Sequence, residues 1–417
     1  MKQQTSLGWI ATALVAVALP AWGQVTPQGP ELRVNHRTDF RQQNPAAAFA
    51  SNGSALVVWE NDQKGVRGQF FGADGNPAGG ELTLAASDAL SGGSEEQQIT
   101  ARREPAVAFL TGGGFALAWT ESREDVKTFA FIETRTILDQ DVMLQRFDSL
   151  GRPAGQRVLV NTTTAGLQSA PRLIARPHGD MIVTWQGSDG GIFARTVNAA
   201  GNLSGHETRL NDAAGSHPVG AASNLGASLI AWEAADGGDI GVFARILDAV
   251  GQPVGPAFRV NTTTVGRQRR PAVAAGADGN FLVAWQGDLA DPRFSSIFAQ
   301  AVGKNGNPLG PQLALVQGVG YDIAQLAPAL AATPSGHFLM TWMGWESDTS
   351  PGLEMAAAEI DSLGNTIGTP TWINQQRVQR NFRRTAIAAN GAGSYLVAWE
   401  TVANNRQSID ARRIGAN

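Results

Sequence analysis

Short apolar runs recur along the chain, and each ends in a tryptophan. The seven runs are ALVVW, FALAW, MIVTW, SLIAW, FLVAW, FLMTW and YLVAW, which end at Trp59, Trp119, Trp185, Trp232, Trp285, Trp342 and Trp399. A glycine stands six residues before every one of these tryptophans. A proline stands fourteen residues before six of them, and Thr385 takes its place in the seventh copy. Two spacings that hold through seven copies indicate an internal structural repeat.

Each copy is typical of β-structure. A run of small residues follows the proline, and the fixed glycine then marks a tight turn into the apolar run, which predicts a hairpin. A third strand such as IFARTV or VFARIL follows a variable gap, and a fourth strand commonly ends in Val-Asn, as in VLVN and FRVN. Four antiparallel strands in every 47–66 residues predict a blade. We therefore expect an all-β fold, a single seven-bladed β-propeller.

The two ends of the chain predict how the ring closes. The C-terminal sequence IDARRIGAN stops after a third strand, whereas residues 31–35 (ELRVN) form an orphan fourth strand ahead of the first proline. We expect this N-terminal strand to complete the last blade and to remove an exposed sheet edge. The seven tryptophans are expected to fill the space between blades, because large rings suit a packed core.

Composition narrows the class of protein. Of the 417 residues, 43% are hydrophobic and 16% charged, which favours a folded core over disorder. The net charge of -4 gives no sign of a basic surface for nucleic acid. The absence of cysteine excludes disulfides, zinc–thiolate sites and cysteine nucleophiles.

Residues 1–23 have the pattern of a secretory signal peptide. Lys2 supplies the positive start, residues 10–19 are apolar, and Ala21 and Gly23 are the small residues expected before a cleavage site. The apolar run is too short to span a bilayer. We expect a signal peptide at 1–23, a propeller at 24–417, a secreted or periplasmic location, and no membrane span.

The repeat resembles one found in secreted and surface proteins of bacteria. The string VNTTTVGRQRRPAVAAGADGNFLVAWQG from Val260, and VNTTTAGLQSAPRL from Val160, are similar to its VNTxTxGxQxxPxVAxxxDGxFxVxW pattern. The resemblance implies a propeller without assigned chemistry, often within a larger surface protein. Here we expect the propeller alone. The signatures of WD, sialidase and integrin-type calcium repeats do not recur.

Loop lengths indicate which face carries function. The loops between strands two and three, and between strand four and the next strand one, vary in length and share one face, called here the variable-loop face. Variable loops on a rigid scaffold commonly bind ligands. The longest one, residues 121–141, predicts either a lid or added hairpin over the channel, or an insertion that covers its own blade.

Polar residues recur at the same face. Glu60, Gln186, Glu233, Gln286 and Glu400 follow their tryptophans directly, and arginines and glutamines stand ahead of strand one. Carboxylates that face arginines could hold an anionic ligand. Glutamine stands three residues before the proline in four blades, however, and a side chain that repeats with the blade favours a structural role.

Residues that break the repeat are the better candidates for ligand binding. An exposed Trp345 beside Glu346 and Asp348 would suit stacking on a sugar ring. The full candidate set is Trp345, Glu346, Asp348, Arg269, Arg270, Arg383, Arg384, Glu233 and Glu400.

No catalytic motif is evident. The five histidines lack a metal-binding spacing, and no nucleophile elbow, P-loop or dinucleotide fingerprint occurs. We assign no catalytic residue, metal ligand or cofactor. Aspartates in the strand two–three loops leave calcium and paired glycosidase carboxylates open, although aspartate is also ordinary turn chemistry.

The sequence therefore favours a non-enzymatic binding or scaffold propeller that recognises an extracellular protein or glycan through its variable-loop face. The alternative is a secreted carbohydrate-active enzyme, a glycosidase or lyase, with acidic residues around the channel. A structural component of an envelope assembly is a third reading. We expect a monomer that binds no nucleic acid.

Overall fold

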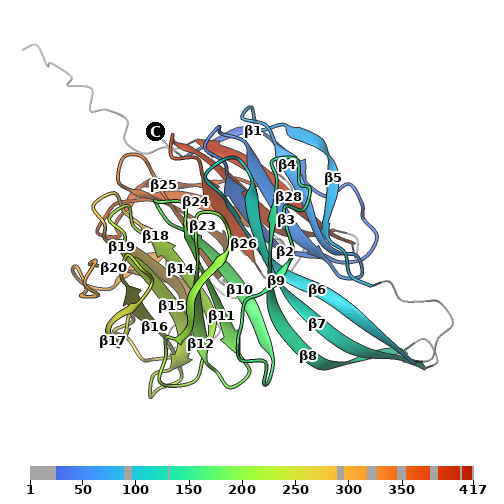
Figure 1. Cartoon of the computed structure of the whole chain (residues 1–417). Helices are drawn as coiled ribbons and strands as arrows, with labels where there is room; N and C mark the ends of the chain where they lie inside the picture. Colours follow the sequence, from blue (N-terminus) through green and yellow to red (C-terminus); the bar gives the residue numbers. More distant parts are fainter. Residues whose placement is uncertain are drawn as a thin grey trace, which may run out of the picture.

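The structure is a computed structural model that describes residues 25–88, 96–129, 132–288, 295–316, 326–344, 354–375, 384–403 and 406–415. The described strands form seven four-stranded antiparallel sheets arranged as the blades of a propeller (Figure 1). The predicted all-β, seven-bladed fold is confirmed. The predicted signal peptide lies outside the described residues. Within the described ranges, no helix has the length and apolar character needed to cross a membrane.

Blades one to six each use four consecutive strands, ordered from the channel outward. Blade one contains β2 (Gln42–Phe49), β3 (Ala55–Asn61), β4 (Gly65–Phe71) and β5 (Pro77–Ala85). Blade two contains β6 (Glu96–Phe109), β7 (Phe115–Phe129), β8 (Ile132–Phe147) and β9 (Val158–Leu159). Blade three contains β10 (Gln168–Ala175), β11 (Met181–Gly187), β12 (Ile192–Val197) and β13 (Leu203–Arg209).

Blade four contains β14 (Gly215–Ala222), β15 (Ser228–Ala235), β16 (Ile240–Leu247) and β17 (Pro253–Arg259). Blade five contains β18 (Gln268–Ala275), β19 (Phe281–Asp288), β20 (Ser295–Val302) and β21 (Leu313–Val316). Blade six contains β22 (Leu326–Ala332), β23 (Phe338–Gly344), β24 (Glu354–Ile360) and β25 (Thr366–Trp372). Blade seven contains β26 (Thr385–Ala389), β27 (Ser394–Ala403), β28 (Arg406–Gly415) and, from the start of the chain, β1 (Thr26–Arg33).

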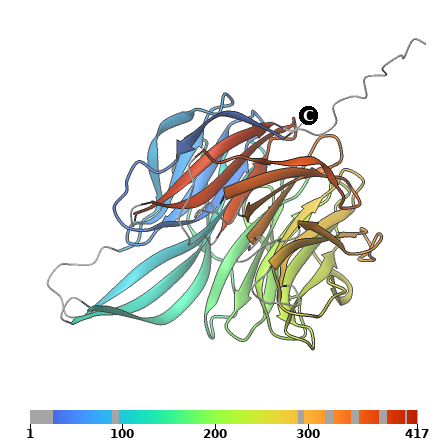
Figure 2. The same cartoon turned by 180° about the vertical axis from the view of Figure 1, so that it is seen from behind.

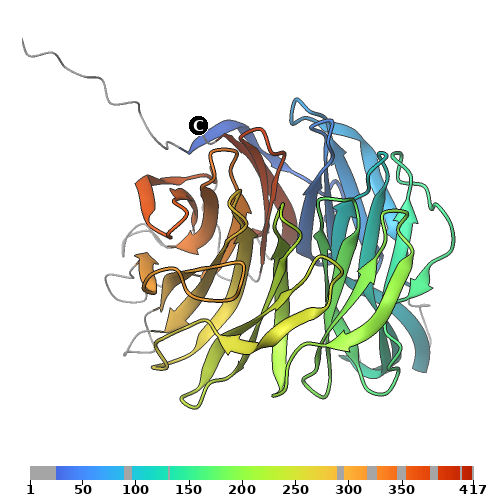
Figure 3. The same ribbon diagram turned by 60° about the vertical axis from the view of Figure 1, so that its left-hand side comes forward.

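The N-terminal strand closes the ring, as predicted. β1 pairs antiparallel with β28, with Leu32 opposite Ala411 and Arg33 opposite Asp410. The blue and red ends of the chain accordingly share one blade (Figures 1 and 3). The Oδ1 atom of Asn35 accepts a hydrogen bond from the buried backbone N–H of Ile409 at 2.7 Å. The last sheet therefore has its outer strand from the opposite end of the sequence.

The recurrent Val-Asn pair has the same structural role in other blades. Its asparagine side chain accepts a hydrogen bond from a backbone N–H of strand three. The bonds run from Val142 to Asn161, from Ile192 to Asn211, from Val242 to Asn261 and from Met355 to Asn374. A buried N–H that lies beyond the ladder of strand four needs such a partner, which explains why the residue type recurs.

All seven repeated tryptophans are buried between blades. Trp185 in blade three packs with Ala118 and Val142 of blade two, and Trp285 in blade five packs with Leu229 and Ala231 of blade four. At the closure, Trp59 of blade one packs with Leu396 of blade seven. The apolar core is thus a set of inter-blade clusters, and a ligand-stacking role for these rings is excluded by their burial.

The described strands of blade two extend further than those of the other blades. Its strands β6, β7 and β8 run 14, 15 and 16 residues and project away from the ring (Figures 1 and 2). The buried Glu124 pairs there with Arg103 and Arg135. The predicted loop at 121–141 is therefore an added hairpin that continues its own sheet, and the residues lining the channel cavity come from other segments.

Removing the closing asparagine should destabilise the ring. Asn35→Ala leaves the buried Ile409 N–H without its partner, and we expect a loss of about 1–3 kcal/mol in the free energy of unfolding. Urea denaturation measures it. The exposed Asn202→Ala is the matched control and should change stability by less than about 0.5 kcal/mol. Equal effects of the two variants would contradict the closure.

The closing seam also predicts a pH effect. Burial raises the pKa of Asp410 from 3.8 to about 6, so the folded state binds this proton more tightly than the unfolded state. The stabilisation that protonated Asp410 gives the folded state is present below about pH 4 and is lost as pH rises through about 6. We expect Asp410→Asn to stabilise the protein by about 2–3 kcal/mol at pH 7 and by nearly nothing at pH 4. Denaturation of both proteins across this range tests it, and a pH-independent difference would refute it.

Candidate functional site

The innermost strand of six blades contains a strained β-bulge. The residue before the repeated proline has a left-handed backbone, with φ between 49° and 56°, at Asn44, Glu104, Ala170, His217, Arg270 and Ala327. Strand register shifts at the same point, for example between Arg269 and Ala272. Non-glycine residues rarely adopt positive φ, so an interaction with another part of the chain must stabilise this backbone conformation.

The preceding blade holds the bulge. In five blades the side chain that follows the tryptophan accepts a hydrogen bond from the bulge N–H of the next blade. The donors and acceptors are Asn44 N to Glu400 Oε1 at 2.6 Å, Glu104 N to Glu60 Oε2 at 3.1 Å, Ala170 N to Thr120 Oγ1 at 3.2 Å, His217 N to Gln186 Oε1 at 2.7 Å and Arg270 N to Glu233 Oε1 at 2.7 Å. These bonds, one of which crosses the closure, tie the blades together around the channel.

The repeated glutamines are structural as well. The Oε1 atoms of Gln42, Gln168 and Gln268 accept hydrogen bonds from the indole N–H of Trp59, Trp185 and Trp285 at 2.8, 3.2 and 2.8 Å. Their Nε2 groups donate to carbonyls of the preceding loop. A buried indole needs an acceptor, so the glutamine repeats with the tryptophan.

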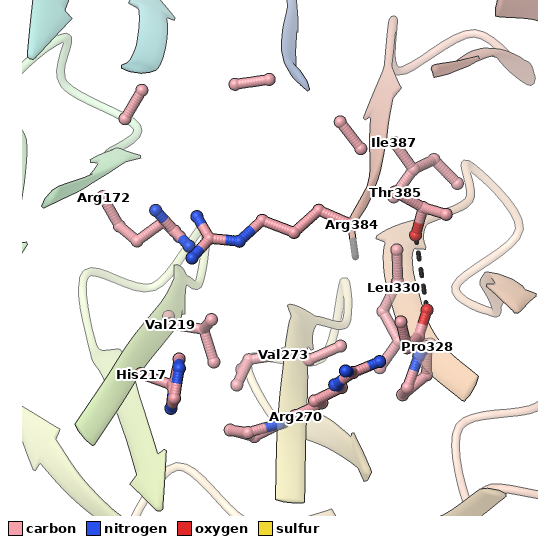
Figure 4. A pocket seen from close by; sticks show the side chains of 18 of the residues that line it. Arg172, His217, Val219, Arg270, Val273, Pro328, Leu330, Arg384, Thr385 and Ile387 are labelled. Atoms are coloured by element: carbon pink, nitrogen blue, oxygen red, sulfur yellow. Dashed lines mark hydrogen bonds between the residues drawn. The ribbon is translucent and has the colours of Figure 1, made fainter. Parts of the chain in front are cut away.

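The bulges display side chains around a cavity in the channel. The cavity has a volume of about 740 Å³ and is lined by residues at or beside all seven innermost strands. Figure 4 shows charged side chains from several blades converging on it. Among the described residues, five arginines and two glutamates line the cavity. The lining is thus positive although the whole chain carries a net charge of -4.

Two arginines point toward each other at one side of this cavity (Figure 4). Arg172 lies on β10 and donates from Nη1 to the Pro171 carbonyl at 2.8 Å, and Arg384 precedes β26. Burial and the charge of Arg384 lower the pKa of Arg172 to about 9, which still leaves it protonated at neutral pH.

Glu104 partly balances this pair. Its Oε1 lies 3.6 Å from Arg384 Nη2, and its Oε2 accepts hydrogen bonds from Thr120 Oγ1 and Ala170 N at 2.9 and 2.8 Å. Burial raises the pKa of Glu104, but the arginines and these bonds outweigh it and hold the pKa below its usual value. One carboxylate therefore faces two guanidinium groups, which leaves a positive charge for an anion.

A histidine–carboxylate pair lies elsewhere on the same cavity. His217 Nδ1 lies 3.2 Å from Glu233 Oε2, and the His217 side chain is 55% exposed while that of Glu233 is 8% exposed. Burial raises the pKa of Glu233, but the bond and charge of His217 and the N–H of Arg270 outweigh it, so the pKa is lowered overall. Glu233 is thus an ionised partner for the imidazole at neutral pH.

The structure places part of the predicted candidate set at this cavity. Arg269, Arg270, Arg384 and Glu233 line it, whereas Glu400 is buried and holds the Asn44 bulge. The other four candidates, Trp345, Glu346, Asp348 and Arg383, lie outside the described residues.

Arg269 also has a structural partner. Its Nη2 pairs with Asp288 Oδ1 at 3.2 Å, and the Nε of Arg267 pairs with the other oxygen of Asp288 at 3.0 Å. Asp288 therefore offsets one of these two positive charges. Arg172 and Arg384 face the single carboxylate of Glu104, so they also contribute positive charge to the cavity.

Sequence reasoning missed Arg172 and Glu104. The available signal was the residue after the repeated proline, which is alanine in five of the blades, valine in blade four and Arg172 in blade three. A charged residue in a row of small ones marks a position that serves something other than packing. Glu104 could be recognised only from the bulge geometry. Polar residues occur throughout this face, so the sequence alone does not distinguish Glu104 from them.

The loop aspartates make local hydrogen bonds. Asp189 accepts from Gly191 N at 2.8 Å and pairs with Arg209 at 2.7 Å, and Asp236 accepts from Gly238 N at 3.1 Å. This is the turn chemistry considered from the sequence. Within the described ranges, no group of three or more histidine, aspartate or glutamate side chains gathers to hold a metal ion.

Comparison with known proteins supports the fold. No family model matches the sequence, and no curated protein matches it. A protein of unknown function from Dyadobacter fermentans DSM 18053 has a similar structure, with a TM-score of 0.53 and 10% identity over 96% of this chain and 100% of that chain. An ulvan lyase of polysaccharide lyase family PL25, bound to -[GlcA(1-4)Rha3S]-, has a TM-score of 0.55 and 12% identity over 92% and 96%. Similarity at this level shows a shared propeller fold.

The two facing arginines should lower the free energy of unfolding, as expected of groups that serve function and not stability. Arg172→Met removes a desolvated charge beside Arg384, and we expect the free energy of unfolding to rise by about 1 kcal/mol at low salt. The gain should shrink at high salt, where the repulsion is screened. Denaturant titration measures it, with the exposed Arg152→Met as a control that should change little. A destabilised Arg172→Met would show that the guanidinium serves packing instead.

Proposed function

We propose that this protein is a secreted or periplasmic binding module that holds an acidic glycan in the channel cavity. The observation that carries the proposal is the pair Arg172 and Arg384, which face each other with Glu104 as their shared carboxylate. Guanidinium groups bind carboxylates and sulfates through paired N–H donors. A sugar that carries either group would relieve the repulsion between the arginines.

The electrostatics favour a charged ligand over a neutral one. The cavity lining has more arginines than glutamates in a chain whose net charge is negative, so positive charge is concentrated at the channel. A general affinity for polyanions would need a broad basic surface. The arrangement instead suits a few anionic groups that enter the cavity.

The dimensions suit a short stretch of glycan. A volume of about 740 Å³ lies within the range of roughly 300–1,000 Å³ typical of small-ligand sites. A chain end or a few sugar units fit this space. The ulvan lyase that shares the propeller fold holds a polymer with a uronic acid and a sulfated sugar, which is the class of ligand proposed here. An extracellular protein is the competing partner.

Binding to acidic polysaccharides tests the proposal. We expect the purified protein to bind polygalacturonate, heparin or ulvan, to ignore dextran, and to lose affinity as salt rises. Arg172→Gln and Arg384→Gln should each weaken binding about tenfold or more, which corresponds to about 1.4 kcal/mol. Isothermal titration calorimetry measures both.

Arg152→Gln is the matched control, because this arginine lies in the turn between β8 and β9, away from the cavity, and should bind like the wild type. Binding that survives both cavity substitutions would overturn the proposed site. If the wild type binds none of the three acidic polymers, the glycan proposal is overturned and a protein partner is favoured.

A further inference from the structure

The His217–Glu233 pair has a geometry that ligand binding does not explain. The imidazole Nδ1 lies 3.2 Å from the buried Glu233 carboxylate, while the rest of the ring is exposed to the cavity that contains Arg172 and Arg384 (Figure 4). We propose that His217 is a catalytic residue that cleaves uronate-containing glycans by β-elimination. The inference rests on the proposed function, because it requires an acidic glycan in this cavity.

Glu233 fixes the state of the imidazole. Its Oε1 is held by the Arg270 N–H at 2.7 Å, so Oε2 stays aimed at His217 Nδ1. The lowered pKa of Glu233 keeps this oxygen an acceptor, which favours the proton on Nδ1 and leaves the Nε2 lone pair available. Ser216 Oγ, at 3.2 Å from Nδ1, is a second hydrogen-bonding neighbour of this nitrogen. This is the orientation that a general base requires.

Other blades show that the fold does not need either side chain. The bulge position of His217 is occupied by Asn44 in blade one and by Ala170 in blade three, with the same left-handed backbone. The position of Glu233 is occupied in blade three by Gln186, which holds the next bulge through the same type of bond at 2.7 Å. The histidine is therefore a departure from the repeat that the bulge geometry does not require.

The chemistry balances with the groups present. A uronate carboxylate bound by guanidinium groups has its negative charge neutralised, which makes the C5–H more acidic. His217 Nε2 takes that proton, the C4–O4 bond breaks, and a C4=C5 double bond forms. The same imidazolium returns the proton to O4 of the departing sugar, so no water, oxidant or metal is consumed. The products are an unsaturated uronate and a glycan with a free hydroxyl.

Incubation with polygalacturonate, ulvan or heparin tests the inference. We expect the ultraviolet absorbance of the conjugated C4=C5 bond to rise with time, and mass spectrometry to show no oxygen from labelled water in the products. His217→Ala and His217→Asn place residues that other blades use at this position, so both should fold. They should lower kcat at least ~100-fold and leave the Kd for the polymer within about twofold.

Glu233→Gln examines the positioning residue separately. Glutamine preserves the bond to Arg270 N–H, as Gln186 does for His217 N–H, so the bulge should stay intact. We expect kcat to fall about 10-fold or more with KM little changed. A residue that served structure alone would not separate the two constants. His206→Ala, on the outer strand β13, is the control and should leave activity unchanged.

The outcomes separate the two proposals. A wild type that binds an acidic polymer but yields no unsaturated product refutes the elimination and leaves the binding module intact. Incorporation of labelled oxygen refutes it in favour of hydrolysis. Undiminished kcat in both His217 variants refutes the assigned base. A wild type that binds none of the polymers refutes both proposals.

Discussion

The second strand of each blade contacts the neighbouring blades on both sides, and the rest of the molecule depends on these two contacts. Its tryptophan packs against the preceding blade, and in five blades the next side chain accepts a hydrogen bond from the bulge of the following blade. Blades are therefore coupled through one apolar and one polar contact that are adjacent in sequence. The closing strand β1 lets this pattern run through the chain termini without an open edge.

The same attachment explains where function can reside. Because the bulge backbone is held by its N–H, its side chain is free to vary without loss of the fold. Asparagine, glutamate, alanine, histidine and arginine all occupy this position in different blades. The ring is thus a scaffold that presents a set of interchangeable side chains to one cavity. Charged groups such as Arg172 in that cavity are predicted to lower stability, and the proposed ligand would explain why they are present.

The architecture was predictable because it repeats. The tryptophan and glycine spacings and the recurring Val-Asn pair have structural causes that act in most blades, and the orphan strand at residues 31–35 completes the one blade that ends the chain. The strained backbone before the proline was not predictable, because six different local sequences adopt it and the cause is a side chain from another blade.

The site was only partly predictable for the same reason. Arg270 and Arg384 stood out as departures from the repeat and Glu233 as one of the recurring polar residues, and all three line the cavity. Arg172 and Arg384 face each other although they belong to blades three and seven, which are far apart in sequence. No local sequence pattern therefore predicts this arrangement. Glu400 resembles Glu233 in sequence, yet the first holds a bulge while the second holds a bulge and also orients His217.

The most direct test of the account is a crystal structure of the protein with an acidic oligosaccharide, such as a short oligogalacturonate. The account predicts a carboxylate seated between the guanidinium groups of Arg172 and Arg384, with a sugar ring beside His217. An oligosaccharide ordered elsewhere on the propeller, with the two arginines contacting solvent alone, would contradict it.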